Sequence, residues 1–173
     1  PEDAVEFDLD SITIQDIREH NTYQGQRATI QTHIGKARVM LQIDIGIGDS
    51  IYPNPIRKKV PPLLEMDGPN IESYPIETVI AEKLEAIIAL SLLTSRMKDF
   101  YDLYIISKTF TLGYEDVSKA VRQTFARRKT ALPNETPAVF TEQVSLDSVK
   151  QTQWKAFVRK LRNAHSSLEL WEV

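Results

Sequence analysis

The sequence predicts an α+β fold in which a strand-rich N-terminal part is followed by a helical C-terminal part. Apolar and polar residues alternate with period two through residues 26–47, a pattern typical of strands. From residue 74 onward, apolar residues recur at helical spacing instead. Five prolines mark residues 53–73, which separate the two patterns. We therefore expect two domains, with the sheet and its proline-rich connection in 1–73 and the helices in 74–173.

The composition is that of an ordinary globular protein, with 173 residues, 42% hydrophobic and 26% charged. Because cysteine is absent, disulfides and thiolate metal sites are excluded, and a cytoplasmic location is expected. The three histidines lack the spacing of zinc ligands. No apolar run is long enough to span a bilayer and no signal peptide is present, so no membrane partner is expected. The net charge of -3 argues against a generic nucleic-acid coat but allows a local basic face.

The strands are expected in three places. A short strand is predicted over residues 5–7. A second element, in which polar and apolar residues mix, is predicted over residues 12–19. A hairpin follows, with strands over residues 26–34 and 37–47. Gly35 begins the two-residue turn between them, where glycine is favoured because it accepts positive φ.

The second hairpin strand separates its side chains into two rows. Asp44 lies on the side opposite the main apolar row, and we expect this strand to be central in the sheet. Gly46 and Gly48 follow, and glycines there let a ligand approach the backbone or permit a bulge. Asp49 closes the run IDIGIGD. The apolar row consists of Val39, Leu41, Ile43 and Ile45.

The proline-rich residues 53–73 are predicted to be an extended connection, because proline restricts the backbone and suits a crossing over the surface. The rest of the chain is predicted to be helical, with a loop over residues 131–137. In the last helix, Val149 and Trp154 are among the residues expected to face inward. Four helices are expected. The first begins at Pro75, and the other three cover Ser95–Ser107, Tyr114–Arg128 and Ser145–Arg162.

One lysine stands out in the first helix. Lys83 lies between Val79 and Ile87 in the middle of an apolar stripe, whereas Glu82 and Glu85 lie off the stripe and are expected to be in water. A buried ammonium needs an anionic partner or must reach solvent along its own aliphatic stem. The next helix offers two aspartates on one side, at positions 99 and 102. The pattern fits either a structural ion pair between two helices or a functional site.

Several motifs, taken in order, resemble the AbiEii/AbiGii nucleotidyltransferase toxin family. They are IDIGIGD, the proline-rich link, YPIETVIAEKLEAI and SRMKDFYDLY, with TFARRKTALP and the WKAF helix further along. The resemblance covers nearly the whole chain. It implies part of a nucleotidyltransferase core of the DNA polymerase β type, with an antiparallel or mixed sheet, followed by a C-terminal helical bundle.

The resemblance also implies a function. Members act as toxins in abortive-infection and type IV toxin–antitoxin systems, so a cognate antitoxin is the expected protein partner. Some resemble enzymes that transfer nucleotides from a nucleoside triphosphate to RNA acceptor ends, so a tRNA-like acceptor is expected. Magnesium is the expected cofactor of the complete protein, because phosphoryl transfer depends on charge neutralisation.

One motif of such enzymes, a glycine turn followed by Asp-x-Asp, belongs before residue 5 in the family pattern. The run Asp8-Leu9-Asp10 lacks a preceding glycine turn and is interpreted as a turn at a strand end. We therefore expect this chain to be the C-terminal portion of such a protein and to be inactive alone. The alternative is a non-catalytic module that binds the antitoxin or the substrate. A metal-dependent nuclease would use the same carboxylates but would leave Lys83 less well explained.

The resemblance assigns roles to individual residues. Asp44 corresponds to the third catalytic carboxylate, a magnesium ligand, and is expected to face Lys83 across a cleft. Lys83 corresponds to the cation that meets the triphosphate. Asp99 and Asp102 correspond to the late acidic motif, which supports the lysine or the metal. Asp49 is either a second metal ligand or a residue that caps the turn.

Other basic residues remain open between two interpretations. Arg96 and Lys98 either contact phosphates of the nucleotide or occupy a solvated helix start. The run at residues 127–129, with Arg122 a turn and a half earlier, either touches the acceptor RNA or follows from the helix dipole, which favours cations at a C-terminus.

Overall fold

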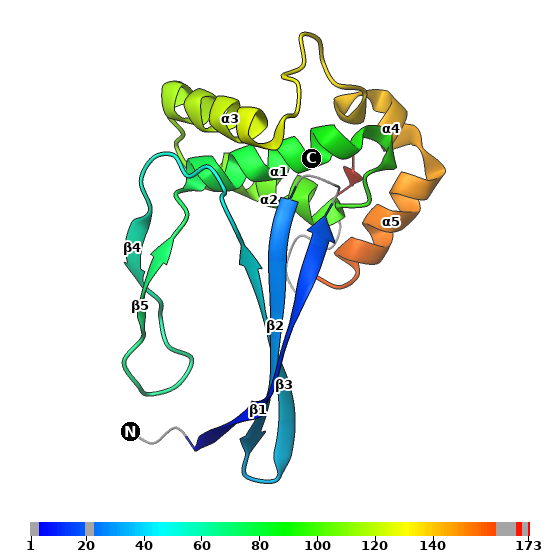
Figure 1. The fold of residues 1–173 in the computed structure, drawn as a ribbon. Coiled ribbons are helices and arrows are strands. Elements are labelled where there is room, and N and C mark those ends of the chain that lie inside the picture. The colour runs from blue at the N-terminus through cyan, green and yellow to red at the C-terminus, as the bar shows by residue number, and fades with distance from the viewer. Residues whose placement is uncertain (1–3, 20–22, 162–168, 171–172) are drawn as a thin grey trace. The chain divides into compact units, whose positions relative to one another are not determined.

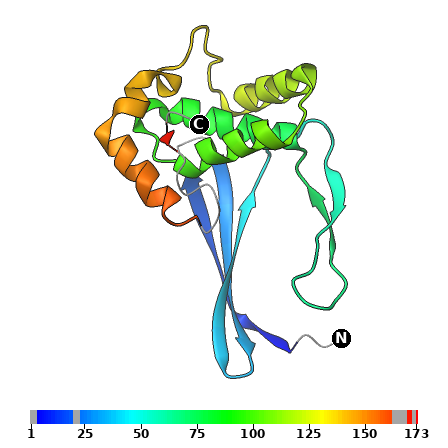
Figure 2. The same cartoon turned by 180° about the vertical axis from the view of Figure 1, so that it is seen from behind.

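The computed structural model describes residues 4–19, 23–161, 169–170 and 173 (Figure 1; Figure 2 shows the reverse side). Strands come first and helices follow, so the predicted α+β fold is confirmed. The chain forms two compact units, Pro1–Asp49 and Ser50–Val173. The proline-rich connection, which the sequence grouped with the sheet, therefore belongs to the unit that holds the helices.

The first unit is a three-stranded antiparallel sheet. Its strands are β1 (Val5–Glu19), β2 (Tyr23–Ile34) and β3 (Ala37–Gly46), in the order β1-β2-β3. The predicted hairpin is confirmed, with Ile34 opposite Ala37 next to the turn. Gly35 has φ +58°, a conformation that glycine adopts without the steric cost other residues meet.

Strand β1 corrects two predictions at once. Two separate elements and a turn at Asp8-Leu9-Asp10 were expected, but the strand runs through all of these residues. The register against β2 shifts between Asp8 and Thr13 instead. The Ser11 hydroxyl bridges the irregular stretch, because it donates to the Asp8 carbonyl (2.6 Å) and accepts from the Gln31 N–H (2.8 Å). The Asp8 carbonyl and the Gln31 N–H thus keep a partner at the shift without the strand ending.

Strand β3 shows the predicted separation of its two faces but not the predicted position in the sheet. It lies at one edge of the described sheet, and β2 is central, so the expectation that Asp44 sits on a central strand is wrong. Among the described strands, β3 pairs with β2 alone, and β1 pairs with the other side of β2. The apolar row on the opposite face from Asp44 is exposed over its whole length, at Val39, Leu41, Ile43 and Ile45.

In the second unit, the proline-rich stretch is not a plain connection. It contains two short strands, β4 (Ile56–Lys59) and β5 (Asn70–Ser73), which pair antiparallel. The prolines lie outside both strands, where their missing N–H groups cost no ladder hydrogen bond. Just before the hairpin, Tyr52 is tied to the first helix, since its N–H donates to the Thr78 hydroxyl and its carbonyl accepts from it (2.9 Å each).

The helices follow the predicted order. Those at Pro75, Ser95 and Tyr114 are confirmed to within two residues, but the last predicted helix is broken at Asp147. The Asp147 carboxylate accepts from the Lys150 N–H (2.8 Å) and so starts a new helix as an N-cap. Val149 is therefore exposed rather than inward, and the predicted end at Arg162 lies outside the described residues. The observed helical segments are α1 (Ile76–Leu90), η1 (Ser91–Leu93), α2 (Met97–Thr109), α3 (Tyr114–Arg128), η2 (Ala138–Phe140), α4 (Glu142–Leu146) and α5 (Ser148–Val158).

The hydrophobic core of the second unit joins the helices at one end of α1. Trp154 on α5 is only 1% exposed and packs with Phe157 and with side chains from α1 and α2. Helix α1 contacts α2 as well as α3, so its two sides are both covered. Among the described helices, none has the length and hydropathy needed to cross a membrane. The core cluster consists of Ile87, Met97, Phe100, Val139, Val144, Trp154, Val158 and Leu170.

Candidate functional site

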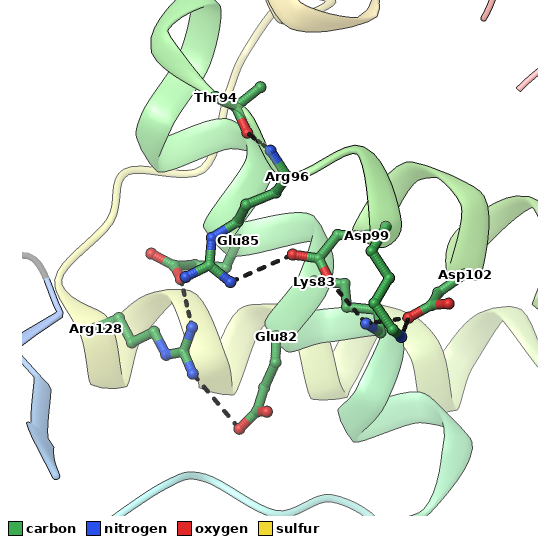
Figure 3. Close-up of polar contacts among 9 residues, drawn as sticks. Glu82, Lys83, Glu85, Thr94, Arg96, Asp99, Asp102 and Arg128 are labelled. Carbon is green, nitrogen blue, oxygen red and sulfur yellow. Dashed lines mark hydrogen bonds and ion pairs between the residues drawn. The ribbon is translucent and has the colours of Figure 1, made fainter. Parts of the chain in front are cut away.

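The ion pair predicted for Lys83 is present between α1 and α2. The Lys83 ammonium donates to Asp99 Oδ1 at 2.7 Å and to Asp102 Oδ2 at 2.6 Å (Figure 3). All three side chains are mostly buried, with exposed fractions of 19% for Lys83, 12% for Asp99 and 21% for Asp102. Because the aspartates are three residues apart on α2, both carboxylates reach one ammonium on the neighbouring helix.

Each aspartate has a second cation. Arg96 Nη1 lies 3.3 Å from Asp99 Oδ2, and Lys98 Nζ lies 2.5 Å from Asp102 Oδ2. The side chains of Arg96 and Lys98 are more exposed than the aspartates they contact, at 35% and 72%. Three basic and two acidic groups thus form one network, which we call the Lys83 cluster, with an excess of one positive charge.

The cluster favours the ionised forms of Lys83 and Asp102. Burial lowers the pKa of Lys83, but the hydrogen bonds and charges of Asp102 and Asp99 outweigh it, and the pKa ends above the ordinary 10.5. Burial likewise raises the pKa of Asp102, but Lys83 and Lys98 bring it below the ordinary 3.8. Lys83 is therefore an ammonium at neutral pH and cannot act as a general base there.

The geometry leaves Lys83 with one further donor. An ammonium carries three N–H bonds, and two of them are directed to Asp99 and Asp102. With 19% of its side chain exposed, Lys83 can offer the third to an oxygen of a bound anion. The aspartates hold the ammonium in place, so a ligand would meet a positioned charge rather than a mobile one.

A second network on α1 escaped the sequence analysis. Glu85 was expected in water, but its side chain is 6% exposed and accepts from Arg128 Nη1 (2.8 Å) and from the Thr130 hydroxyl (2.5 Å). Arg128 also lies 3.5 Å from Glu82 (Figure 3). The reason is that α1 has a second buried side, which packs on α3.

A signal for this second side does exist in the sequence. Thr78, Ala81 and Glu85 follow one another at helical spacing, and all three are buried. Two of them are small, which is what close packing of two helices needs. The apolar stripe around Lys83 drew attention to the other side of the helix and hid this one.

Asp44 has an ion pair of its own in the first unit. Arg27 on β2 lies directly opposite and binds both carboxylate oxygens, with Nε 2.7 Å from Oδ1 and Nη2 2.9 Å from Oδ2. The hydrogen bond from Arg27 lowers the pKa of Asp44. Lys83 belongs to the other unit, so the expectation that Asp44 faces it across a cleft stays a prediction.

The described residues do not fit the expected magnesium site by themselves. Two-metal chemistry needs several carboxylate oxygens around one point. Asp44 is already held by a bidentate guanidinium, and within the described ranges no three His, Cys, Asp or Glu side chains gather closely enough to hold a metal. Asp49 therefore gains no support as a ligand, and its role stays a prediction.

A comparison with known protein families identifies the family of this chain. Residues 2–173 match the family described as nucleotidyl transferase AbiEii toxin, Type IV TA system, where TA stands for toxin–antitoxin. The chain belongs to this family. No match was found among curated proteins or among solved structures. As a member, the chain is a nucleotidyltransferase toxin of a type IV toxin–antitoxin system, with a cognate antitoxin as its partner.

In this AbiEii family member, the basic run at the end of α3 is divided in two. Arg128 points to α1 and is neutralised by the glutamates there. Lys129 is exposed and ends the helix in the left-handed conformation, with φ +57°. Arg122, about two turns before Lys129, is exposed as well. The helix dipole accounts for cations in the last turn but not for one in the middle of the helix.

Proposed function

We propose that the protein transfers a nucleotide from a nucleoside triphosphate to an RNA acceptor, and that Lys83 contacts the triphosphate. The family gives the reaction class, and the Lys83 cluster gives a positioned ammonium that keeps one donor for a phosphate oxygen. Phosphoryl transfer relies on positioning and on neutralising charge, which is the contribution such an ammonium makes.

Asp99 and Asp102 are positioning residues in this proposal. They hold the Lys83 ammonium, and each is held in turn by a cation at the start of α2. Arg96 and Lys98 could move from their aspartates to a phosphate only by leaving these pairs. Their role in nucleotide binding is therefore proposed as secondary to that of Lys83.

Asp44 is proposed to act on the reacting groups through its carboxylate, whose lowered pKa keeps it ionised at neutral pH. Dependence on magnesium is proposed from the family chemistry alone. A cytoplasmic location is also proposed, because a sequence without cysteine suits a reducing compartment.

The decisive experiment compares Lys83→Met with Lys108→Met. Both substitutions remove one lysine charge, but Lys108 lies at the far end of α2 above the Tyr104 ring, outside the Lys83 cluster. Incorporation of labelled nucleotide into RNA would be measured for the wild type and for both variants under the same conditions. We expect Lys83→Met to abolish incorporation while circular dichroism shows a folded protein, and Lys108→Met to leave it unchanged. Full incorporation by folded Lys83→Met would refute the proposal.

One observation favours a second candidate function, a non-catalytic module that binds the antitoxin. The apolar row on β3 is exposed, and exposed apolar surface often marks a binding site for another protein. Tight binding of the antitoxin by an intact gene product that transfers no nucleotide under any condition would favour this candidate.

A further inference from the structure

The basic residues of the chain are unevenly distributed. Residues 117–134 contain five lysines and arginines and no acidic residue. The rest of the chain carries the other 16 basic residues and all 24 acidic ones. A protein with a net charge of -3 therefore holds one strongly basic segment, and this segment is most of α3 with the loop after it.

Three of these basic residues share the outer side of α3. Lys119, Arg122 and Lys129 are exposed and follow one another at intervals of three and seven residues, which places them on one side of a helix. The spacing puts Lys119 about 4.5 Å and Lys129 about 10.5 Å along the axis from Arg122. On the opposite side, Thr124 is buried and Arg128 reaches the glutamates of α1. From Lys119 onward, helix α3 thus presents one covered side and one basic, solvent-facing side, whereas the exposed Glu115 lies one turn earlier on the same side.

Contacts within the protein do not neutralise this outer side. Among the described residues, none of the three takes part in an ion pair, whereas Arg128 pairs with two glutamates. Lys119 lies over the ring of Tyr52, with Nζ 4.4 Å from the ring centroid. A cation–π contact steadies the side chain and leaves its charge in place.

We propose that this outer side of α3, formed by Lys119, Arg122 and Lys129, binds the phosphate backbone of an RNA. The choice of RNA rests on the proposed function, which requires an RNA acceptor. The chemistry of the surface supports a nucleic acid over a protein partner. Protein interfaces favour aromatic side chains and are depleted in lysine, whereas nucleic-acid interfaces are polar and positively charged. The residue that lies between Arg122 and Lys129 on this side is the small, exposed Ala126, which offers no anchor for a protein.

The proposal predicts a defined salt dependence. Each phosphate neutralised on a single strand contributes about -0.7 to the slope of log K against log salt, so three contacts give a slope of about -2. Raising the salt from about 50 to 200 mM should then weaken binding by about 16-fold. Removing two of the three charges should reduce the slope to about -0.7.

The test measures binding of a fluorescently labelled RNA hairpin with a single-stranded 3′ end, without nucleotide, at several salt concentrations. Arg122→Gln/Lys129→Gln is compared with Lys155→Gln/Arg159→Gln, which removes one exposed lysine and one exposed arginine at the end of α5. We expect the first variant to lose affinity and most of the slope, and the second to behave as the wild type. Should the first variant melt early, Lys119→Gln/Arg122→Gln replaces it.

Two results would overturn the proposal. One is an equal loss of RNA affinity in both double variants, which would mean that only net charge matters. The other is an unchanged slope together with weaker binding of the cognate antitoxin, which would assign the surface to the protein partner. Because RNA binding is measured without transfer, failure of the proposed reaction would be seen separately, as normal salt-dependent binding with no nucleotide incorporated.

Discussion

Replacing Lys83 by methionine tests how the Lys83 cluster stabilises the fold. The substitution replaces a charge with a similar apolar volume in an apolar stripe. It leaves Asp99 with Arg96 at 3.3 Å and Asp102 with Lys98 at 2.5 Å, so neither carboxylate loses its last cation. We expect the free energy of unfolding to fall by less than about 1 kcal/mol.

Removing both aspartates should cost more. Asp99→Ala/Asp102→Ala leaves the Lys83 ammonium without either of its acceptors. Stranding a fully buried charge costs about 3–5 kcal/mol, and the 19% exposure of Lys83 reduces this to about 2–4 kcal/mol. Each single aspartate variant should fall between the double variant and Lys83→Met, since Lys83 retains one acceptor.

Urea unfolding of the four variants and the wild type, followed by circular dichroism, gives these differences directly. The order is the test. If Lys83→Met unfolds at the lowest urea concentration, the ammonium stabilises the fold more than the aspartates do. A purely structural ion pair would then explain the site better. Adding Lys83→Met to the double variant should restore stability, because no stranded charge then remains.

Further predictions concern pH, the second network and Asp44. The wild type should have a larger free energy of unfolding than Asp102→Asn, and this difference should be fully present between pH 3.8 and 10.5. It should vanish as the pH falls through the lowered pKa of Asp102 or rises through the raised pKa of Lys83, which urea unfolding at several pH values measures. Glu85→Ala should destabilise by about 1–3 kcal/mol in the same assay, because it leaves Arg128 with only the longer contact to Glu82 at 3.5 Å and removes the acceptor of the Thr130 hydroxyl, and adding Arg128→Met should relieve part of this loss. Asp44→Asn should leave the melting temperature unchanged but abolish nucleotide incorporation by the intact gene product, so normal incorporation would exclude Asp44 from the reaction.

The part of the structure that the sequence revealed best is governed by local patterns. Lys83 stood out because helical periodicity places it in an apolar stripe, and its partners were found because two acids three apart share one side of the next helix. Helix α3 was placed with correct bounds for the same reason, since its apolar residues recur regularly from Tyr114 onward.

The features that the sequence did not reveal depend on contacts between distant segments. Strands β4 and β5 pair across residues 60–69, and the prolines that flank the two strands suggested an irregular connection. Glu85 looked like a surface residue because nothing near it in the sequence indicates that Arg128, on another helix, would cover it. The break before α5 arises because Asp147 caps a new helix, and apolar periodicity does not register a cap.

Helix α1 connects the two proposed sites of the second unit. On one side it holds Lys83 against the aspartates of α2, and on the other it holds Arg128 of α3 through Glu82 and Glu85. The glutamates neutralise the inward arginine, so the positive charge that remains on α3 is the charge directed outward. The same ion pairs that pack α3 on α1 therefore present the basic side of α3 to solvent, in a fixed relation to the Lys83 ammonium. In a nucleotidyltransferase of this family, that arrangement would hold an acceptor backbone and a triphosphate on one rigid pair of helices.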